Sequence, residues 1–85
     1  MNDKEIFSKL LAIFREVFDD ELLNITEEMG YGDLEEWDSL THIRILLSVE
    51  KEFKFKFDIE DIGKLVTVGD IIRYIKENVN RGNES

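Results

Sequence analysis

Apolar residues recur every three or four positions in three separate segments of this chain. This spacing places them on one face of an α-helix, and such a face is buried from water only when it packs against another element. The first segment starts at once, because Asn2 and Glu5 have the spacing of a capping box, and it ends near Asp19. Its apolar positions are Ile6, Phe7, Leu10, Ile13, Phe14, Val17 and Phe18.

The other two helical segments also begin at residues that cap helices well. One begins at Ser39, directly after Asp38. The other follows Thr67, which has capping-box spacing to Asp70, and its apolar positions are Val68, Ile71, Ile72, Ile75 and Val79. For the segment from Ser39 we predict an inward face made of Leu40, Ile43, Leu46, Leu47 and Phe53, with Val49 at its margin.

Two connections separate these helices. The first is long and acidic, and we expect its apolar residues to hold it against the core: Leu22, Leu23, Ile25, Met29 and Leu34. The second contains the run Phe53–Phe57, in which phenylalanine and lysine alternate as in a strand. No second run of this kind is present to pair with it, and a lone strand is not stable in water. We therefore predict an extended link with Phe53 and Phe57 packed inward, then a short helix over 58–62 that Gly63 ends.

The length of 85 residues suits one domain with a modest core. We predict an all-α bundle of four helices with a short third helix, formed by residues 1–79, and a polar tail over 80–85. The absence of cysteine excludes disulfides, thiolate metal sites and a cysteine nucleophile. No signal peptide is recognisable and no apolar stretch approaches the roughly 20 residues of a membrane span, so we expect a cytoplasmic protein.

The net charge of −9 is unevenly distributed. All of it lies in residues 1–38, whereas the rest of the chain is neutral. Repulsion from phosphates argues against a nucleic-acid partner, since affinity for DNA or RNA depends on lysine and arginine. The acidic surface suits a partner with a basic docking patch, and it also keeps a small domain soluble.

The tripeptide Asp38-Ser39-Leu40 places a hydroxyl at the start of a helix. There the unpaired backbone N–H groups and the positive end of the helix dipole favour an attached or bound phosphate. The alternative is that Asp38 and Ser39 only cap the helix, which is the commoner role of these residue types.

From about Trp37 to Tyr74 the sequence resembles the acyl carrier protein family, with a looser match through the first helix. The resemblance consists of an Asp-Ser-Leu motif opening a helix, the stretch Glu50–Phe53, an extended link, a short helix, and Thr67 with Val68 opening the last helix. The form Glu36–Leu40 further resembles stand-alone carriers of bacterial biosynthetic clusters. The implied fold is the acyl-carrier four-helix bundle, with a long loop between helices one and two.

The resemblance implies that Ser39, flanked by Asp38 and Leu40, carries 4′-phosphopantetheine. A phosphopantetheinyl transferase would attach this group from coenzyme A. Its thiol would hold an acyl or aminoacyl group as a thioester, so the prosthetic group would supply the thiol that a chain without cysteine lacks. The expected partners are that transferase, a loading enzyme and downstream transferases. The chain itself would be a monomeric carrier and not an enzyme.

The resemblance also implies a docking surface and a cargo pocket. Docking would use the second helix, with Asp38, Thr41, Arg44, Glu50 and Lys51. Because Thr41, Arg44 and Lys51 stand where acids are common in the family, we expect dedicated partners. The apolar residues matching the cargo region are Ile43, Leu47, Phe57, Ile62 and Leu65, for which ordinary core packing is the alternative.

Other candidate sites are weaker. Ser39 and His42 share a helix face and suggest a nucleophile with its base, but no nucleophile elbow or oxyanion hole accompanies them. We expect His42 to be a surface residue near the prosthetic group. The run 19–21 is acidic but lacks the spacing of a calcium loop, so no metal is expected. Trp37 is a docking anchor or, as we expect, folds back to fix the loop before Ser39.

Two classes of function remain open on the sequence. One is the phosphopantetheine-bearing carrier, of which a peptidyl carrier protein is a variant. The other is an unmodified helical interaction module with the same fold. The cargo also stays open among a short hydroxy acid, an amino acid, a polyketide extender and a fatty acyl chain.

Overall fold

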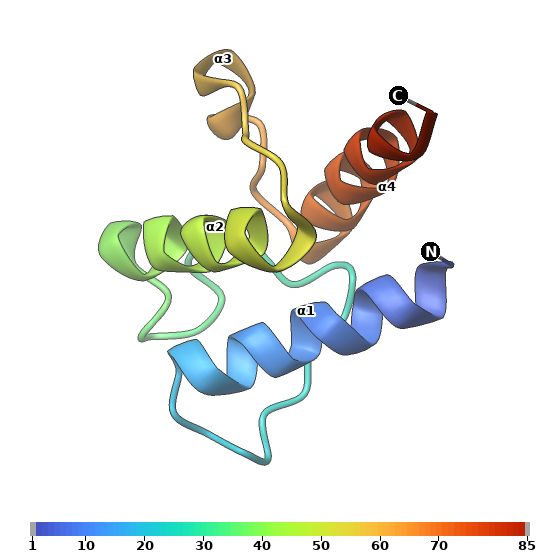
Figure 1. The fold of residues 1–85 in the computed structure, drawn as a ribbon. Coiled ribbons are helices and arrows are strands. Elements are labelled where there is room, and N and C mark those ends of the chain that lie inside the picture. The colour runs from blue at the N-terminus through green and yellow to red at the C-terminus, as the bar shows by residue number, and fades with distance from the viewer. Residues whose placement is uncertain (1, 85) are drawn as a thin grey trace.

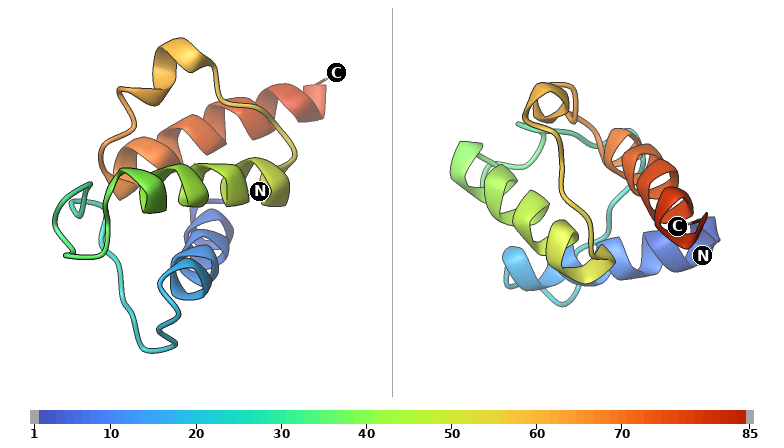
Figure 2. Two further views of the ribbon diagram at one scale, coloured as in Figure 1. Left: turned by 90° about the vertical axis from the view of Figure 1, so that its left-hand side faces the viewer. Right: turned by 45° about the horizontal axis from the view of Figure 1, so that its top comes forward.

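Four helices make up the fold in the computed structural model, which describes residues 2–84. They are α1 (Asp3–Val17), α2 (Ser39–Phe53), α3 (Ile59–Ile62) and α4 (Val68–Glu84). The helix α1 packs against both α2 and α4, and α3 lies on the side of these two helices that faces away from α1 (Figure 1; Figure 2). No strand occurs in the described range, which confirms the all-α prediction with a short third helix. Within the same range no helix is both long enough and apolar enough to cross a membrane.

The predicted helix starts are confirmed by their capping hydrogen bonds. The Asn2 side chain accepts a hydrogen bond from the Glu5 amide at 2.8 Å. The Asp70 amide donates to the Thr67 hydroxyl, and the Thr67 amide donates to the Asp70 carboxylate, both at 3.1 Å. At its other end α4 continues to Glu84, so residues 80–84 of the predicted polar tail are helical.

The faces that α1 and α4 turn to the core are those that the sequence spacing predicts. The buried residues of α1 are Ile6, Leu10, Ile13 and Phe14. The buried residues of α4 are Val68, Ile71, Ile72 and Ile75. Removal of these side chains from water is the main source of stability in a domain of this size.

The prediction for the inward face of α2 is partly wrong. Leu40, Ile43 and Leu47 are 68%, 52% and 58% exposed. The buried residues of α2 are Ile45, Leu46, Val49 and Phe53. Apolar residues occupy more of the circumference of α2 than the rest of the protein covers. Leu40, Ile43 and Leu47 therefore form an exposed apolar stripe along this helix.

Residues 18–38, between α1 and α2, are held to the core mainly by two side chains. Ile25 and Trp37 are buried, and Leu23, Met29 and Leu34 pack against the core while partly exposed. The expectation for Leu22 is wrong, because its side chain is 87% exposed. The burial of Trp37 confirms that this residue folds back and is not a free docking anchor.

The same loop is also hydrogen-bonded to the chain that enters α4. The Tyr31 amide donates to the Val66 carbonyl at 2.9 Å, and the Val68 amide donates to the Met29 carbonyl at 2.8 Å. Gly30 permits this approach, since a Cβ atom there would lie 2.8 Å from the Val66 carbonyl oxygen. The loop before α2 and the loop before α4 are therefore joined to each other by backbone hydrogen bonds.

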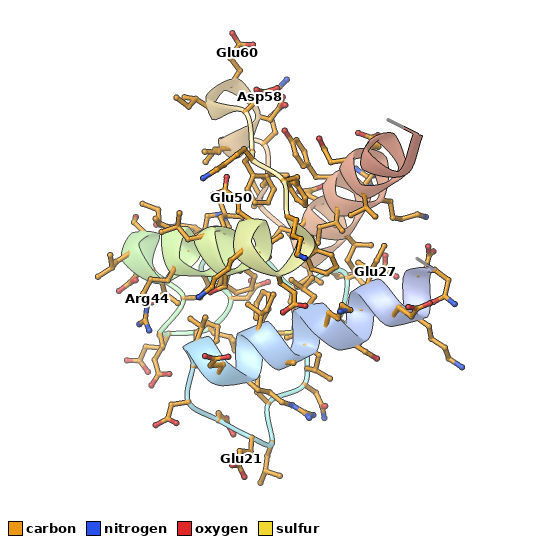
Figure 3. The ribbon with its side chains drawn as sticks, viewed as in Figure 1. Glu21, Glu27, Arg44, Glu50, Asp58 and Glu60 are labelled. Carbon is orange, nitrogen blue, oxygen red and sulfur yellow. The ribbon has the colours of Figure 1, made fainter. Side chains whose placement is uncertain are left out.

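The link between α2 and α3 has the predicted extended form. Phe53 and Phe57 are buried, whereas Lys54 and Lys56 are exposed. Glu50 points from α2 toward this link, and its carboxylate accepts a hydrogen bond from the Phe57 amide at 2.7 Å (Figure 3).

The short helix α3 is hydrogen-bonded to α4 through the phenol of Tyr74. The Tyr74 hydroxyl accepts a hydrogen bond from the Asp58 amide at 3.0 Å and donates one to the Asp61 carboxylate at 3.2 Å. These two contacts hold both ends of the α3 turn above α4.

Candidate functional site

The site begins at the first residue of α2. Ser39 is exposed there, and the start of α2 lies at the far side of the molecule from the end of α4 (Figure 1). The capping hydrogen bond comes from Asp38, whose carboxylate accepts from the Thr41 amide at 2.9 Å. This bond lowers the pKa of Asp38, which stays ionised at neutral pH. Since Asp38 does the capping, the hydroxyl of Ser39 is not used to satisfy the helix end.

The Ser39 hydroxyl has a partner that the sequence analysis missed. The Tyr31 hydroxyl lies 2.6 Å from Ser39 Oγ. Tyr31 stands eight residues earlier, in the long loop, and nothing in the local spacing connects it with Ser39. The backbone hydrogen bond from Tyr31 to Val66 holds the loop between α1 and α2 in place, and this loop lies alongside the start of α2.

His42 lies behind this pair and joins three segments. Its Nδ1 accepts a hydrogen bond from Trp37 Nε1 at 3.0 Å, and its Nε2 lies 2.8 Å from the Leu65 carbonyl oxygen. Because an indole N–H only donates, Nδ1 must be the unprotonated nitrogen and Nε2 must donate to Leu65. Burial lowers the pKa of His42, although the bond to the Leu65 carbonyl favours the charged form. The ring is therefore neutral at neutral pH.

This arrangement changes the expectations for His42. The side chain is half-buried, not a surface residue, and both ring nitrogens are used in structural hydrogen bonds. A general base for Ser39 needs a free nitrogen within hydrogen-bond reach of the hydroxyl. His42 offers none, so the pair does not form a hydrolase site.

An apolar groove of about 320 Å³ opens beside Ser39, between α2 and the loop that precedes α4. Its lining residues are Tyr31, Ser39, His42, Ile43, Ile62, Gly63, Leu65 and Val66. Of the predicted cargo residues, Ile43, Ile62 and Leu65 meet here. Leu47 lies in a neighbouring depression with Lys51, and Phe57 belongs to the core.

The residues expected at the docking surface lie along α2. Asp38, Arg44 and Lys51 are exposed, and Thr41 is half-buried. Arg44 points away from the link to α3, on the opposite side of α2 from Glu50 (Figure 3). Glu50 also has a structural role besides its expected place on the docking surface, because its carboxylate accepts the hydrogen bond from the Phe57 amide.

The residues at the start of α2 fit a covalently attached phosphate ester. The accepting oxygen is exposed, it stands at the electropositive end of a fifteen-residue helix, and the first turn of α2 carries no acidic side chain. The groove beside it offers apolar surface to a longer attached chain. An accessible hydroxyl at a helix N-terminus with an adjacent apolar groove suits a carrier protein that holds its cargo on a covalent arm.

The comparisons with known proteins agree with this class. The family described as "Phosphopantetheine attachment site" matches residues 8–75. An acyl carrier protein of Thermotoga maritima is 37% identical over 76 residues, which cover 89% of this chain and 94% of that protein. A meromycolate extension acyl carrier protein of Mycolicibacterium aurum is 33% identical over 76 residues, which cover 89% of this chain and 78% of the relative.

A solved structure agrees as well. The solution NMR structure of a holo acyl carrier protein from Geobacter metallireducens matches with a TM-score of 0.85 at 35% identity, covering 93% of this chain and 91% of that one. The chain belongs to the acyl carrier protein family. It is a carrier and not an enzyme, and it bears a covalently attached 4′-phosphopantetheine. This finding favours the modified carrier over an unmodified interaction module and over a peptidyl carrier.

Proposed function

We propose that Ser39 is the attachment residue and that the chain presents acyl intermediates to enzymes dedicated to it. The observation that carries the attachment site is the exposed Ser39 hydroxyl at the N-terminus of α2, which is not used for capping because Asp38 caps the helix. When bound, the prosthetic group supplies a terminal thiol that holds an acyl group as a thioester. Ser39 anchors it, and the tether raises the local concentration of the cargo at each partner.

The attachment is tested by incubating the purified chain with coenzyme A and a promiscuous phosphopantetheinyl transferase. Intact mass should show one added arm on the wild type and none on Ser39→Ala. Ser8→Ala is the matched control, since Ser8 is an exposed serine on α1 and its loss should leave loading unchanged. An arm that persists in Ser39→Ala, or a wild type that accepts none while remaining folded, contradicts the assignment.

The groove beside Ser39 is the proposed cargo site. Ile43, Ile62 and Leu65 give it apolar walls next to the attachment point, and Asp38 and Leu40 flank that point on the chain. Its position supports a role in shielding the first part of the arm or a short acyl chain. Burial of apolar groups there is worth roughly 25 cal/mol per Å².

The exposed part of α2 is the proposed docking surface for the transferase, the loading enzyme and the downstream enzymes. Leu40 and Leu47 supply apolar surface, and Arg44 and Lys51 supply positive charge in a chain that is otherwise strongly acidic. Thr41 and Glu50 complete the surface that we expected from the sequence. This mixed charge supports recognition by partners that carry acidic groups at the matching positions.

Charge reversal tests this surface. Arg44→Glu should raise the KM of the loading enzyme from the same biosynthetic cluster about threefold or more, with kcat little changed, because a rim charge acts mainly on encounter. Arg73→Glu on α4 is the matched control, since its surface ion pair with Asp70, at 3.6 Å, contributes little. An unchanged KM for Arg44→Glu removes that residue from the docking surface.

A further inference from the structure

The contact between Tyr31 and Ser39 is the only hydrogen bond that either hydroxyl makes to another described residue. At 2.6 Å it is a short bond for two hydroxyl groups. Tyr31 is 45% exposed, so its hydroxyl can be reached from outside together with Ser39. The pair therefore lies where an attaching enzyme has to work.

Tyr31 is held in place from two directions. Its amide donates to the Val66 carbonyl at 2.9 Å. Its ring stands edge-on to the ring of His42, with centroids 5.5 Å apart and an interplanar angle of 82°. His42 is fixed in turn by Trp37 and Leu65. The phenol is thus presented by packed groups rather than by a free loop.

The acidity of the two hydroxyls indicates the direction of the bond. A phenol O–H is a stronger hydrogen-bond donor than an alcohol O–H, because the aromatic ring withdraws electron density from the oxygen. On this argument Tyr31 is the donor and Ser39 Oγ the acceptor in the bond between them. The proton of Ser39 is left pointing away from Tyr31, toward solvent and an incoming base.

We propose that Tyr31 is a positioning residue for the attachment of phosphopantetheine to Ser39, and that its hydroxyl donates to the phosphodiester once the bond is made. This inference rests on the proposed role of Ser39. In the attachment step, the Ser39 Oγ–phosphorus bond forms and the phosphoanhydride bond of coenzyme A breaks. The adenosine bisphosphate leaves with the electron pair of that bond, and the serine proton passes to a base of the transferase.

The phenol suits both states of the site. Before the reaction it orients the oxygen that attacks, which affects the chemical step more than the binding of the carrier. Afterwards the same donor lies near an anionic phosphate, and hydrogen bonds to charged acceptors are the stronger ones. Loss of one such bond should reduce kcat/KM for attachment about 3- to 10-fold, mainly through kcat.

The test compares Tyr31→Phe with Tyr74→Phe. Tyr74 is the matched control because it is the other tyrosine, and its hydroxyl bonds to Asp58 and Asp61 away from Ser39. Attachment from coenzyme A is timed by intact mass with a promiscuous transferase, and circular dichroism confirms that both variants fold. The ³¹P resonance of each modified protein is then recorded.

We expect slower attachment and a displaced ³¹P resonance in Tyr31→Phe, with Tyr74→Phe like the wild type in both. A Tyr31→Phe rate within twofold of the wild type, or above it, overturns the positioning role, and an unmoved ³¹P resonance overturns the contact with the phosphodiester. If the wild type accepts the arm on Ser39 but Tyr31→Phe behaves identically, only this inference fails. If the wild type accepts no arm on Ser39, the proposed function itself fails.

Discussion

Trp37 offers the sharpest test of how the loop before Ser39 is held. Its side chain is 1% exposed and stands edge-on to Phe14, with ring centroids 5.1 Å apart. It also donates its indole N–H to His42 at 3.0 Å. Trp37→Phe keeps an aromatic ring against Phe14 and removes the donor. The substitution therefore separates the hydrogen bond from most of the packing.

The expected destabilisation follows from two terms. A lost hydrogen bond that leaves His42 Nδ1 without a donor costs about 1–2 kcal/mol. The smaller ring leaves a void that adds about 1 kcal/mol. The sum of about 2–3 kcal/mol is a large share of the roughly 4–13 kcal/mol expected for a domain of this length. The melting temperature should fall by about 10–20 °C, and the protein should remain folded at 25 °C.

Urea unfolding at pH 7 measures this loss. Far-UV circular dichroism is the signal, since the substitution removes the only tryptophan. Phe18→Leu is the matched control, because Phe18 contacts Trp37 with ring centroids 6.3 Å apart but makes no hydrogen bond to it. A loss below about 0.5 kcal/mol in Trp37→Phe, with an unchanged m-value, would refute the reasoning.

Three further predictions concern the same surroundings. Burial lowers the pKa of His42 in the folded protein, so below about pH 6.5 the unfolded chain binds more protons than the folded chain does. Acid should therefore destabilise the fold. An NMR titration that places the pKa of His42 in the folded protein at or above 6.5 would contradict this prediction. Gly30→Ala should cost about 1–3 kcal/mol in urea unfolding, because its Cβ would lie 2.8 Å from the Val66 carbonyl oxygen, and wild-type stability would exclude that clash. Tyr74→Phe should speed amide exchange in α3 by severalfold through loss of the Asp61 contact, and unchanged exchange would show that α3 is held otherwise.

Much of this fold could be predicted from the sequence because the determining interactions are local. Helix starts depend on side chains that bond to amides three residues away, as Asn2 and Thr67 do. The core faces of α1 and α4 follow from apolar residues that recur at helical spacing on one side of each helix. The position of Ser39 at a helix start belongs to this group as well, because its own neighbour Asp38 caps α2.

The inward face of α2 could not be predicted in the same way. Apolar residues occupy several sides of this helix, so the spacing alone does not decide which of them α1 and α4 cover. The structure buries Ile45 and Val49 and leaves Ile43 and Leu47 exposed. The choice depends on packing between segments that are distant in sequence.

The side chains that surround Ser39 could likewise not be predicted from the sequence. Tyr31 reaches Ser39 from a loop that is hydrogen-bonded to Val66, and the ring nitrogens of His42 are hydrogen-bonded to Trp37 and Leu65. Each of these contacts joins different segments of the chain. Local patterns placed Ser39, the proposed attachment residue, at a helix start, but they did not predict the side chains that surround it.

The central claim, that Ser39 holds the arm, is tested most directly by fragmenting the modified protein in the mass spectrometer. Fragments that end at Asp38 should keep the unmodified mass, and those that extend through Ser39 should carry the whole added arm. An arm that localises to Ser8 or Ser48 instead would contradict the assignment of Ser39.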